Sequence, residues 1–296
     1  MKNSLGILLG LITALGWGLS DFAARFASRR IGAYRALLYM QIIGFLALSA
    51  YLGATGGFRG SAPGWHPWAL ALSAGVLNTI GSLALYYSFE VGVLTIVAPI
   101  SSSYPAITVV LALLSGERIH AISAMGLGLT LIGLILAATS FSAPAARIGS
   151  EAEVSNARLS NGVGWSIVSM VCFGIMFWFL GFHVLPVLGA AVSVWVIRLS
   201  TLSLLLVAST PSRQRVGLPR GRVWWLLVLM GLLDTAAYVS NNAGLRTGAV
   251  SIVTVVASLY GAITVLLSAL FLHERLDRSQ WFGIALIFTG IILVSL

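Results

Sequence analysis

The residues best suited to chemistry in this chain are polar side chains that lie deep within apolar runs. Asn78 and Asp234 lie near the middles of two such runs and are 156 residues apart. A polar group without a partner in hydrocarbon is costly, so such side chains usually face a cavity or another helix. We interpret both as lining a central cavity, where Asp234 binds a substrate amine or carries a proton. A hydrogen bond between helices is the alternative role for each.

Further polar side chains follow these two at intervals of four residues, which places them on the same helix faces. Two neighbouring runs add serines and tyrosines. In one of them Pro99 and Pro105 interrupt the hydrogen-bond ladder, which exposes backbone carbonyls to a ligand. The alternative for each serine is a hydrogen bond to the preceding turn of its own helix. With Asn78, the candidate substrate-binding residues are Ser82, Tyr86, Ser101, Tyr104, Tyr238, Asn242, Ser258 and Tyr260.

Two tryptophans and one arginine also lie within apolar runs rather than at their ends. Trp17 and Trp178 are away from the interfaces where tryptophan normally anchors a helix, so we interpret them as an aromatic wall for the cargo. Packing against lipid is the alternative. Arg198 could bind a carboxylate, but snorkelling or ion pairing is the favoured interpretation.

Other charged residues are interpreted as structural. Asp21 precedes Arg25 by four residues, a spacing that allows a local ion pair on a helix. Glu117-Arg118 and Glu274-Arg275 stand at the ends of two apolar runs, where we expect them to cap helix ends.

The chain lacks the residue patterns of a catalytic or metal centre. Its 4 histidines are scattered near the ends of apolar runs, and its single cysteine, Cys172, has no clustered partners. The glycine-rich segment 126–133 is continuous apolar helix with no preceding strand, so it is not a phosphate-binding loop. We therefore expect no enzymatic activity, no cofactor and no bound metal.

The composition requires lipid as the main solvent. Hydrophobic residues make up 58% of the 296 residues and charged residues only 8%, and the mean hydropathy is +0.99. This leaves too little polar surface to coat a soluble globule. The net charge of +9 comes from arginines between apolar runs, where they meet lipid headgroups rather than nucleic acid.

Crossing about 30 Å of hydrocarbon takes roughly 20 helical residues, and ten runs are long enough. We place them at 4–24, 34–53, 67–89, 94–114, 120–140, 161–182, 189–209, 222–244, 249–271 and 278–296. Most glycines within these runs are expected to permit close helix packing.

The sequence also repeats itself. Tyr104-Pro-Ala-Ile-Thr recurs as Tyr260-Gly-Ala-Ile-Thr, 156 residues later. Each half holds an odd number of spans, so halves that fold alike must insert in opposite orientations. We therefore predict an all-α integral membrane protein, whose ten transmembrane helices form two inverted five-helix repeats around a central cavity. The repeats are placed at residues 1–141 and 161–296, with a polar linker at 142–160.

Several segments of the chain resemble those of a known family. The segment 98–108, Ala-Pro-Ile-Ser-Ser-Ser-Tyr-Pro-Ala-Ile-Thr, is similar to the EamA-type repeat of the drug/metabolite transporter (DMT) superfamily. So are the following Ser115-Gly-Glu-Arg-Ile119 and, in the second half, His273-Glu-Arg-Leu276. Gly16-Trp-Gly18, matched by Cys172-Phe-Gly174, fits as well. Within the superfamily the chain most resembles bacterial amino-acid and metabolite exporters, including the YddG-like aromatic amino acid exporters.

The resemblance implies a secondary transporter in the bacterial inner (plasma) membrane that exports small metabolites, amino acids above all, by alternating access. Expected partners are a small-molecule substrate and membrane lipid, with no nucleic acid, and the chain is expected to act as a monomer. Drug export is one alternative. Transport of sugar phosphates or nucleotide sugars is another, but it needs clustered cations, for which Arg198 is the only candidate. An intramembrane enzyme would need paired acids or a histidine-rich site inside the spans, and a structural scaffold would need no aligned polar faces.

The expected orientation is contradictory. Most arginines fall in the connections on the side opposite to the two termini, so the positive-inside rule places the termini outside the cell. The resemblance implies cytoplasmic termini, and this is the orientation that we adopt.

Overall fold

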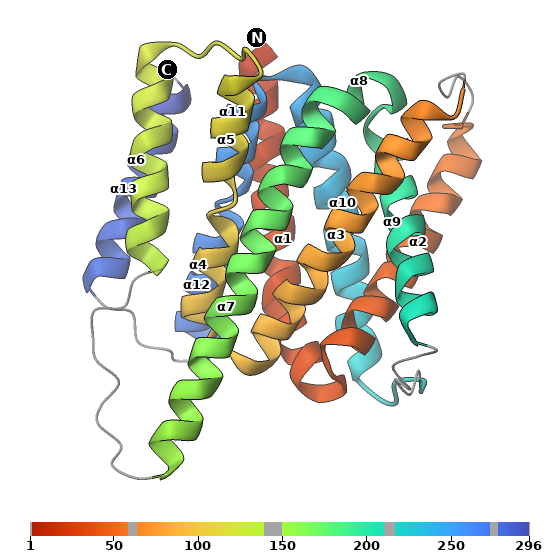
Figure 1. Cartoon of the computed structure of the whole chain (residues 1–296), viewed down its shortest axis with the longest axis vertical. Helices are drawn as coiled ribbons and strands as arrows, with labels where there is room; N and C mark the ends of the chain where they lie inside the picture. The colour runs from red at the N-terminus through yellow and green to blue at the C-terminus, as the bar shows by residue number, and fades with distance from the viewer. Residues whose placement is uncertain (1, 59–63, 139–149, 210–216, 273–277, 296) are drawn as a thin grey trace.

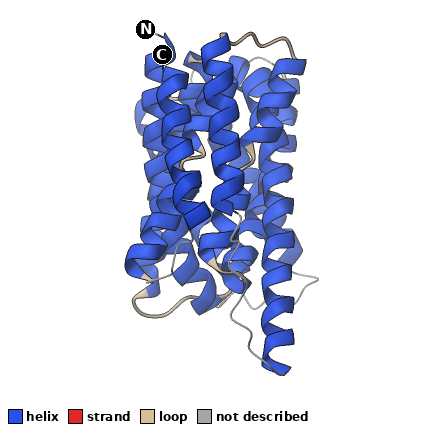
Figure 2. Cartoon of the chain, turned by 90° about the vertical axis from the view of Figure 1, so that its left-hand side faces the viewer, coloured by secondary structure: helices blue, strands red, loops and turns tan. Residues whose placement is uncertain are grey.

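The computed structural model describes all residues of the chain except 1, 59–63, 139–149, 210–216, 273–277 and 296 (Figure 1). Helices joined by short loops make up the described part, in which there is no strand (Figure 2). The first half contains α1 (Lys2–Ile31), α2 (Ala33–Thr55), α3 (His66–Val91), α4 (Leu94–Ser102), α5 (Pro105–Leu114) and α6 (Ala121–Ala138). The second half contains α7 (Ser150–Phe179), a π-helical turn η1 (Leu180–Val184), α8 (Leu185–Leu188), α9 (Ala190–Ser209), α10 (Val223–Thr247), α11 (Val250–Ala257), α12 (Tyr260–Phe271) and α13 (Arg278–Ser295).

The ten predicted spans are all present. Among the described residues, 8 helical segments are long and apolar enough to cross a membrane, with α4–α5, α7–η1–α8 and α11–α12 each forming one segment. The fifth and tenth spans are α6 and α13, of 18 residues each. These two helices pack against each other at one side of the molecule (Figure 1). The chain is a multi-pass integral membrane protein.

The two halves run in opposite directions. In Figure 1, α1 begins at the top beside the N-terminus, whereas α7 begins at the opposite end. The same packing then occurs twice. A Cβ added to Gly18 of α1 would lie 2.6 Å from Ile263, and one added to Gly174 of α7 would lie 2.7 Å from Ile107. Because both pairs correspond in the repeat, the opening helix of each half packs closely against the fourth span of the other half.

The fourth span of each half is broken at its centre. The predicted interruption by proline is confirmed, since α4 contains Pro99 and α5 starts at Pro105. The corresponding break between α11 and α12 contains no proline and was not predicted. Gly261, at the start of α12, lies so close to α4 that an added Cβ would overlap the side chain of Ser102. The two broken spans therefore cross next to their breaks.

A carboxylate joins the halves at one end of these spans. Glu117 Oε1 accepts a hydrogen bond of 3.1 Å from the N–H of Ser251, in the first turn of α11. Burial raises the pKa of Glu117, and hydrogen bonds from the Ser251 and Val250 backbone oppose this increase. Glu117 thus caps a helix end, as predicted, and this helix belongs to the other half. Glu274 and Arg275 lie outside the described residues.

The predicted linker is described only in part. Residues 139–149 lie outside the described part, and α7 begins at Ser150. Residues 150–160, more than half of the predicted linker, are therefore a helical extension of the sixth span. The expected domain limits remain predictions.

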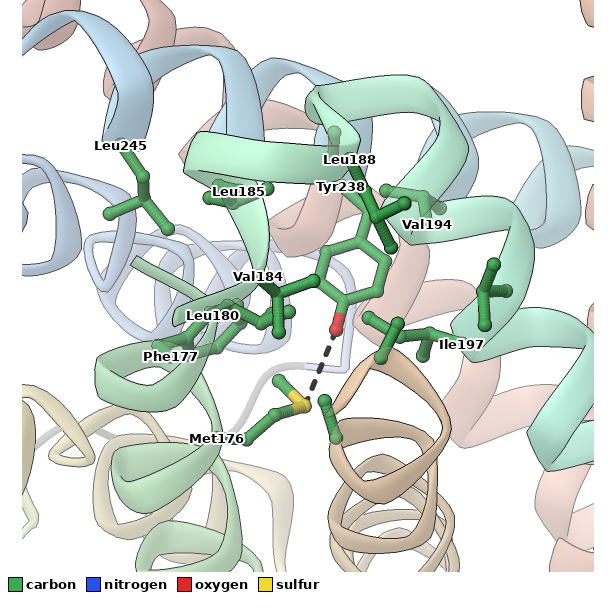
Figure 3. Close-up of a cluster of buried hydrophobic side chains, with 14 of the residues drawn as sticks. Met176, Phe177, Leu180, Val184, Leu185, Leu188, Val194, Ile197, Tyr238 and Leu245 are labelled. Atoms are coloured by element: carbon green, nitrogen blue, oxygen red, sulfur yellow. Dashed lines mark hydrogen bonds between the residues drawn. The ribbon is translucent and has the colours of Figure 1, made fainter. Parts of the chain in front are cut away.

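Two apolar clusters meet at the centre of the molecule. One gathers side chains of η1, α8 and α9 around Trp17 and Tyr238. Figure 3 shows part of it, in which the Tyr238 hydroxyl donates to Met176 Sδ at 3.3 Å. The other cluster lies among α1, α2, α3, α4, α9 and α10 and includes Met40, Leu85 and Tyr86. Members of both clusters line one cavity, so the cavity lies where the clusters meet.

Candidate functional site

The cavity is built by spans of both halves. It contains about 580 Å³ of space that no atom fills, including the part open to the outside. Helices α1, α2 and α3 of the first half contribute lining side chains, as do α7, α9, α10 and α12 of the second. The full lining consists of Trp17, Asp21, Met40, Gln41, Asn78, Ser82, Leu85, Tyr86, Tyr104, Phe173, Phe177, Arg198, Asp234, Tyr238 and Tyr260.

An ion pair lies at one wall of the cavity. Arg198 Nη2 donates to Asp234 Oδ2 at 2.6 Å, and Arg198 Nη1 donates to Gln41 Oε1 at 2.7 Å. The arginine side chain is only 1% exposed. Gly44 of α2 makes room for the guanidinium group, since a Cβ there would lie 2.7 Å from Arg198 Cζ. Ion pairing, rather than snorkelling, therefore explains how this arginine is accommodated within a span.

The predicted ion pair between Asp21 and Arg25 is wrong. Arg25 donates instead to the backbone carbonyls of Phe89 and Gly92, at the C-terminal end of α3. The last carbonyls of a helix have no partner within it and attract a cation. Asp21 is 7% exposed and lines the cavity. None of the described residues donates a hydrogen bond to its Oδ2.

Aromatic rings make up much of the remaining wall. The Trp17 ring centroid lies 5.6 Å from that of Phe177, 5.8 Å from Tyr260 and 5.9 Å from Tyr238. The rings of Tyr104 and Tyr260, which correspond in the repeat, are stacked with centroids 6.3 Å apart. Each tyrosine carries a polar hydroxyl group at the end of its ring. These side chains therefore combine apolar contact with hydrogen-bonding capacity.

Asn78 holds its place through contacts between the two halves. Its Nδ2 donates to Thr201 Oγ1 at 3.0 Å, and its Oδ1 lies 3.5 Å from the Tyr238 hydroxyl, whose one hydrogen is shared between this oxygen and Met176 Sδ. Ser82 and Tyr86 follow Asn78 on the same face of α3 and also line the cavity. These three residues therefore form one polar face of α3 towards the cavity, as their spacing predicted.

Four of the predicted residues are not among those that line the cavity: Ser101, Trp178, Asn242 and Ser258. The indole of Trp178 donates to Ser115 Oγ at 2.8 Å. Asn242 is fully buried and donates to Ser193 Oγ at 3.1 Å. The Ser258 hydroxyl donates to the preceding turn of its own helix, which is the alternative that the sequence had left open.

Several lining residues were not among the predicted ones. Asp21 was placed near the end of the first span, but α1 continues to Ile31, so Asp21 lies well inside the helix. Gln41 is a polar residue within an apolar run and could have been found by the criterion used for Asn78. Phe173 could have been found because it corresponds to Trp17 in the repeat. Met40, Leu85 and Phe177 carry no sequence signal that separates them from packing residues.

Known proteins resemble this chain in sequence and in fold. An uncharacterized protein of Methanocaldococcus jannaschii is 31% identical over 131 residues, which are 44% of this chain and 93% of that protein. That relative therefore has about the length of one repeat. An uncharacterized transporter from the cobO 3′ region of a Sinorhizobium species is 30% identical over 90 residues, 30% of this chain and 64% of the relative.

A solved crystal structure matches the fold along almost the whole length. It superimposes with a TM-score of 0.72 and covers 98% of this chain and 97% of its own, at 16% sequence identity. A sequence profile of the EamA-like transporter family matches residues 4–139 and 160–296, so each half carries one copy of the family's repeat. With ten spans, two repeats and a central cavity, the chain belongs to the EamA-like transporter family of membrane transporters for small molecules.

Proposed function

We propose that this transporter exports small metabolites, with neutral and aromatic amino acids as the favoured cargo, by alternating access across the inner membrane. The observation that carries the proposal is a cavity in which aromatic rings and charged side chains from both halves face one space. Small-molecule sites have mainly apolar walls with a few polar groups. The lining of this cavity fits that pattern.

The charged groups of the cavity argue against phosphorylated cargo. Arg198 is the one cationic side chain among the described residues that line it, and both terminal nitrogens of this arginine already have partners. A phosphate group binds best to several unpaired cations or backbone N–H groups. Sugar phosphates and nucleotide sugars are therefore disfavoured.

The architecture supports alternating access. The apolar clusters lie on two sides of the cavity, and each contains side chains from both halves. Relative motion of two inverted repeats can open one side while it closes the other. The broken spans α4–α5 and α11–α12 cross beside the cavity, where Tyr104 and Tyr260 contribute to its wall.

Counterflow in liposomes tests this function. Purified protein is reconstituted with a panel of unlabelled amino acids inside, and uptake of the labelled compound is compared with that of empty liposomes. We expect transient accumulation of at least one neutral or aromatic amino acid. Ser82→Trp, which fills the cavity, is expected to abolish it. Absence of accumulation for the whole panel, with protein that remains monodisperse, would contradict amino-acid transport.

A further inference from the structure

Asp21 is a buried carboxyl group, one oxygen of which has no partner among the described residues. It is more than nine-tenths buried, it lines the cavity, and its Oδ2 accepts no hydrogen bond from any described residue. Removing an ion from water costs several kcal/mol unless a partner compensates it. In a transporter, a buried acidic group that lines the cavity without a partner points to a partner that arrives with the cargo.

Asp234, the other carboxylate of the cavity, is in a different situation. Its Oδ2 is 2.6 Å from Arg198 Nη2, and Gln41 holds the same guanidinium group in place. A ligand cation at Asp234 would therefore compete with Arg198. The described lining holds two carboxyl groups and one guanidinium group, so only one of the two carboxyl groups has a cationic partner there. A single positive charge on the ligand would supply a partner for the other.

The rings next to Asp21 suit a cation as well. Trp17 precedes Asp21 by one helix turn, so both side chains lie on the same face of α1. The Trp17 ring contacts those of Tyr260 and Phe177. Aromatic faces attract cations through their quadrupole, and tryptophan does so most strongly. A carboxylate beside such rings recognises an ammonium group rather than an anion or a neutral polar group.

From this arrangement we propose that the cargo carries an ammonium group and that Asp21 is its counter-charge, with Trp17 and Tyr260 packed against the cation. The inference rests on the proposed transport function and narrows its substrate class. An amino acid and a simple amine both supply this group. Arg198 and Asp234 would then act as a fixed pair that shapes the adjacent wall.

Four matched probes test the ammonium requirement. Phenethylamine and phenylalanine carry the group, whereas 3-phenylpropanoate and 2-phenylethanol offer the same ring without it. Each probe is titrated calorimetrically against the full chain in nanodiscs. We expect binding of at least one ammonium probe and at least tenfold weaker binding of the other two. Binding of phenethylamine alone would identify a simple amine as the cargo, whereas binding of phenylalanine would identify an amino acid.

Two variants assign the binding to Asp21. Asp21→Asn keeps the shape of the side chain but removes its charge, and we expect about a ten- to hundredfold loss of affinity for the ammonium probe. Glu117→Gln is the matched control, because it neutralises a carboxylate outside the cavity and should leave this affinity unchanged. Failure of both ammonium probes to bind, comparable binding of the neutral or anionic probe, or unchanged affinity in Asp21→Asn would overturn the inference.

The transport assay separates this inference from the proposed function. If counterflow occurs and is unaffected by Asp21→Asn, transport stands and the role of Asp21 is wrong. If ammonium probes bind through Asp21 but no amino acid of the panel is transported, the binding site stands and the proposed amino-acid transport is wrong.

Discussion

At the scale of single residues, the charges within the spans differ in how they are compensated. Arg198 donates to two side-chain oxygens, those of Asp234 and Gln41, that come from different helices. Oδ2 of Asp21 accepts no hydrogen bond from the described residues. Asp21 and Asp234 look alike in the sequence, since each is an acidic residue in an apolar run. Their hydrogen-bond partners distinguish them. The pairing with Arg198 suggests a structural role for Asp234, and the unpaired oxygen suggests a ligand-binding role for Asp21.

The ion pair is expected to show coupling in a double-mutant cycle. Asp234→Asn leaves Arg198 buried without its counter-charge, and we expect a loss of about 3 kcal/mol of stability. Arg198→Gln should be destabilising for the same reason. The double variant removes both charges, so it should recover part of the loss, with a coupling energy of about 1–3 kcal/mol. Thermal unfolding of the four proteins in one detergent measures this, and strictly additive losses would contradict the pairing.

At the scale of elements, the crossing of the broken spans depends on close backbone approach. Gly261→Ala would place a Cβ against Ser102 at the start of α12. Overpacking of this kind costs about 1–3 kcal/mol, so we expect a lower thermal midpoint. Gly128→Ala in α6 is the matched control, because nothing lies within 4 Å of its added Cβ. That control should be neutral or slightly stabilising through better helix propensity. Equal behaviour of the two variants would argue against the close crossing.

The capping carboxylate predicts a pH dependence of stability. Burial raises the pKa of Glu117 above its ordinary value. The folded state therefore favours the protonated acid, and this contribution to stability is present at low pH and lost as pH rises through the folded pKa. Relative to Glu117→Gln, which does not titrate, the wild type should lose stability as the pH is raised from about 4.5 towards neutrality. Parallel stability curves for the two proteins over this range would show that Glu117 does not contribute as described.

At the scale of the whole molecule, the two repeats create the site by crossing each other. Neither half lines the cavity alone, since α1, α2 and α3 of one half face α7, α9 and α10 of the other. The relative from Methanocaldococcus jannaschii has about the length of one repeat.

Cysteine labelling can show that the central cavity is the transport route. In a Cys172→Ser background, Ser82→Cys introduces a thiol that faces the cavity, whereas Ser258→Cys places one in packing contacts outside it. We expect a transported substrate to slow maleimide labelling of Ser82→Cys at least about threefold and to leave Ser258→Cys unaffected. Equal protection of both thiols would indicate a global change in accessibility instead of occupancy of the cavity.

Hydropathy and the internal repeat were enough to predict ten spans and two inverted halves. Each span must form its backbone hydrogen bonds within itself and must be long enough to cross the bilayer. Helical spacing also placed Asn78, Ser82 and Tyr86 on one face. The partners of Arg198 and Asp21 depended on tertiary structure. Asp234 follows Arg198 by 36 residues on the next long helix, and Gln41 comes from the other half. Side-chain pairing across helices depends on rotation and depth, which periodicity within one helix does not determine.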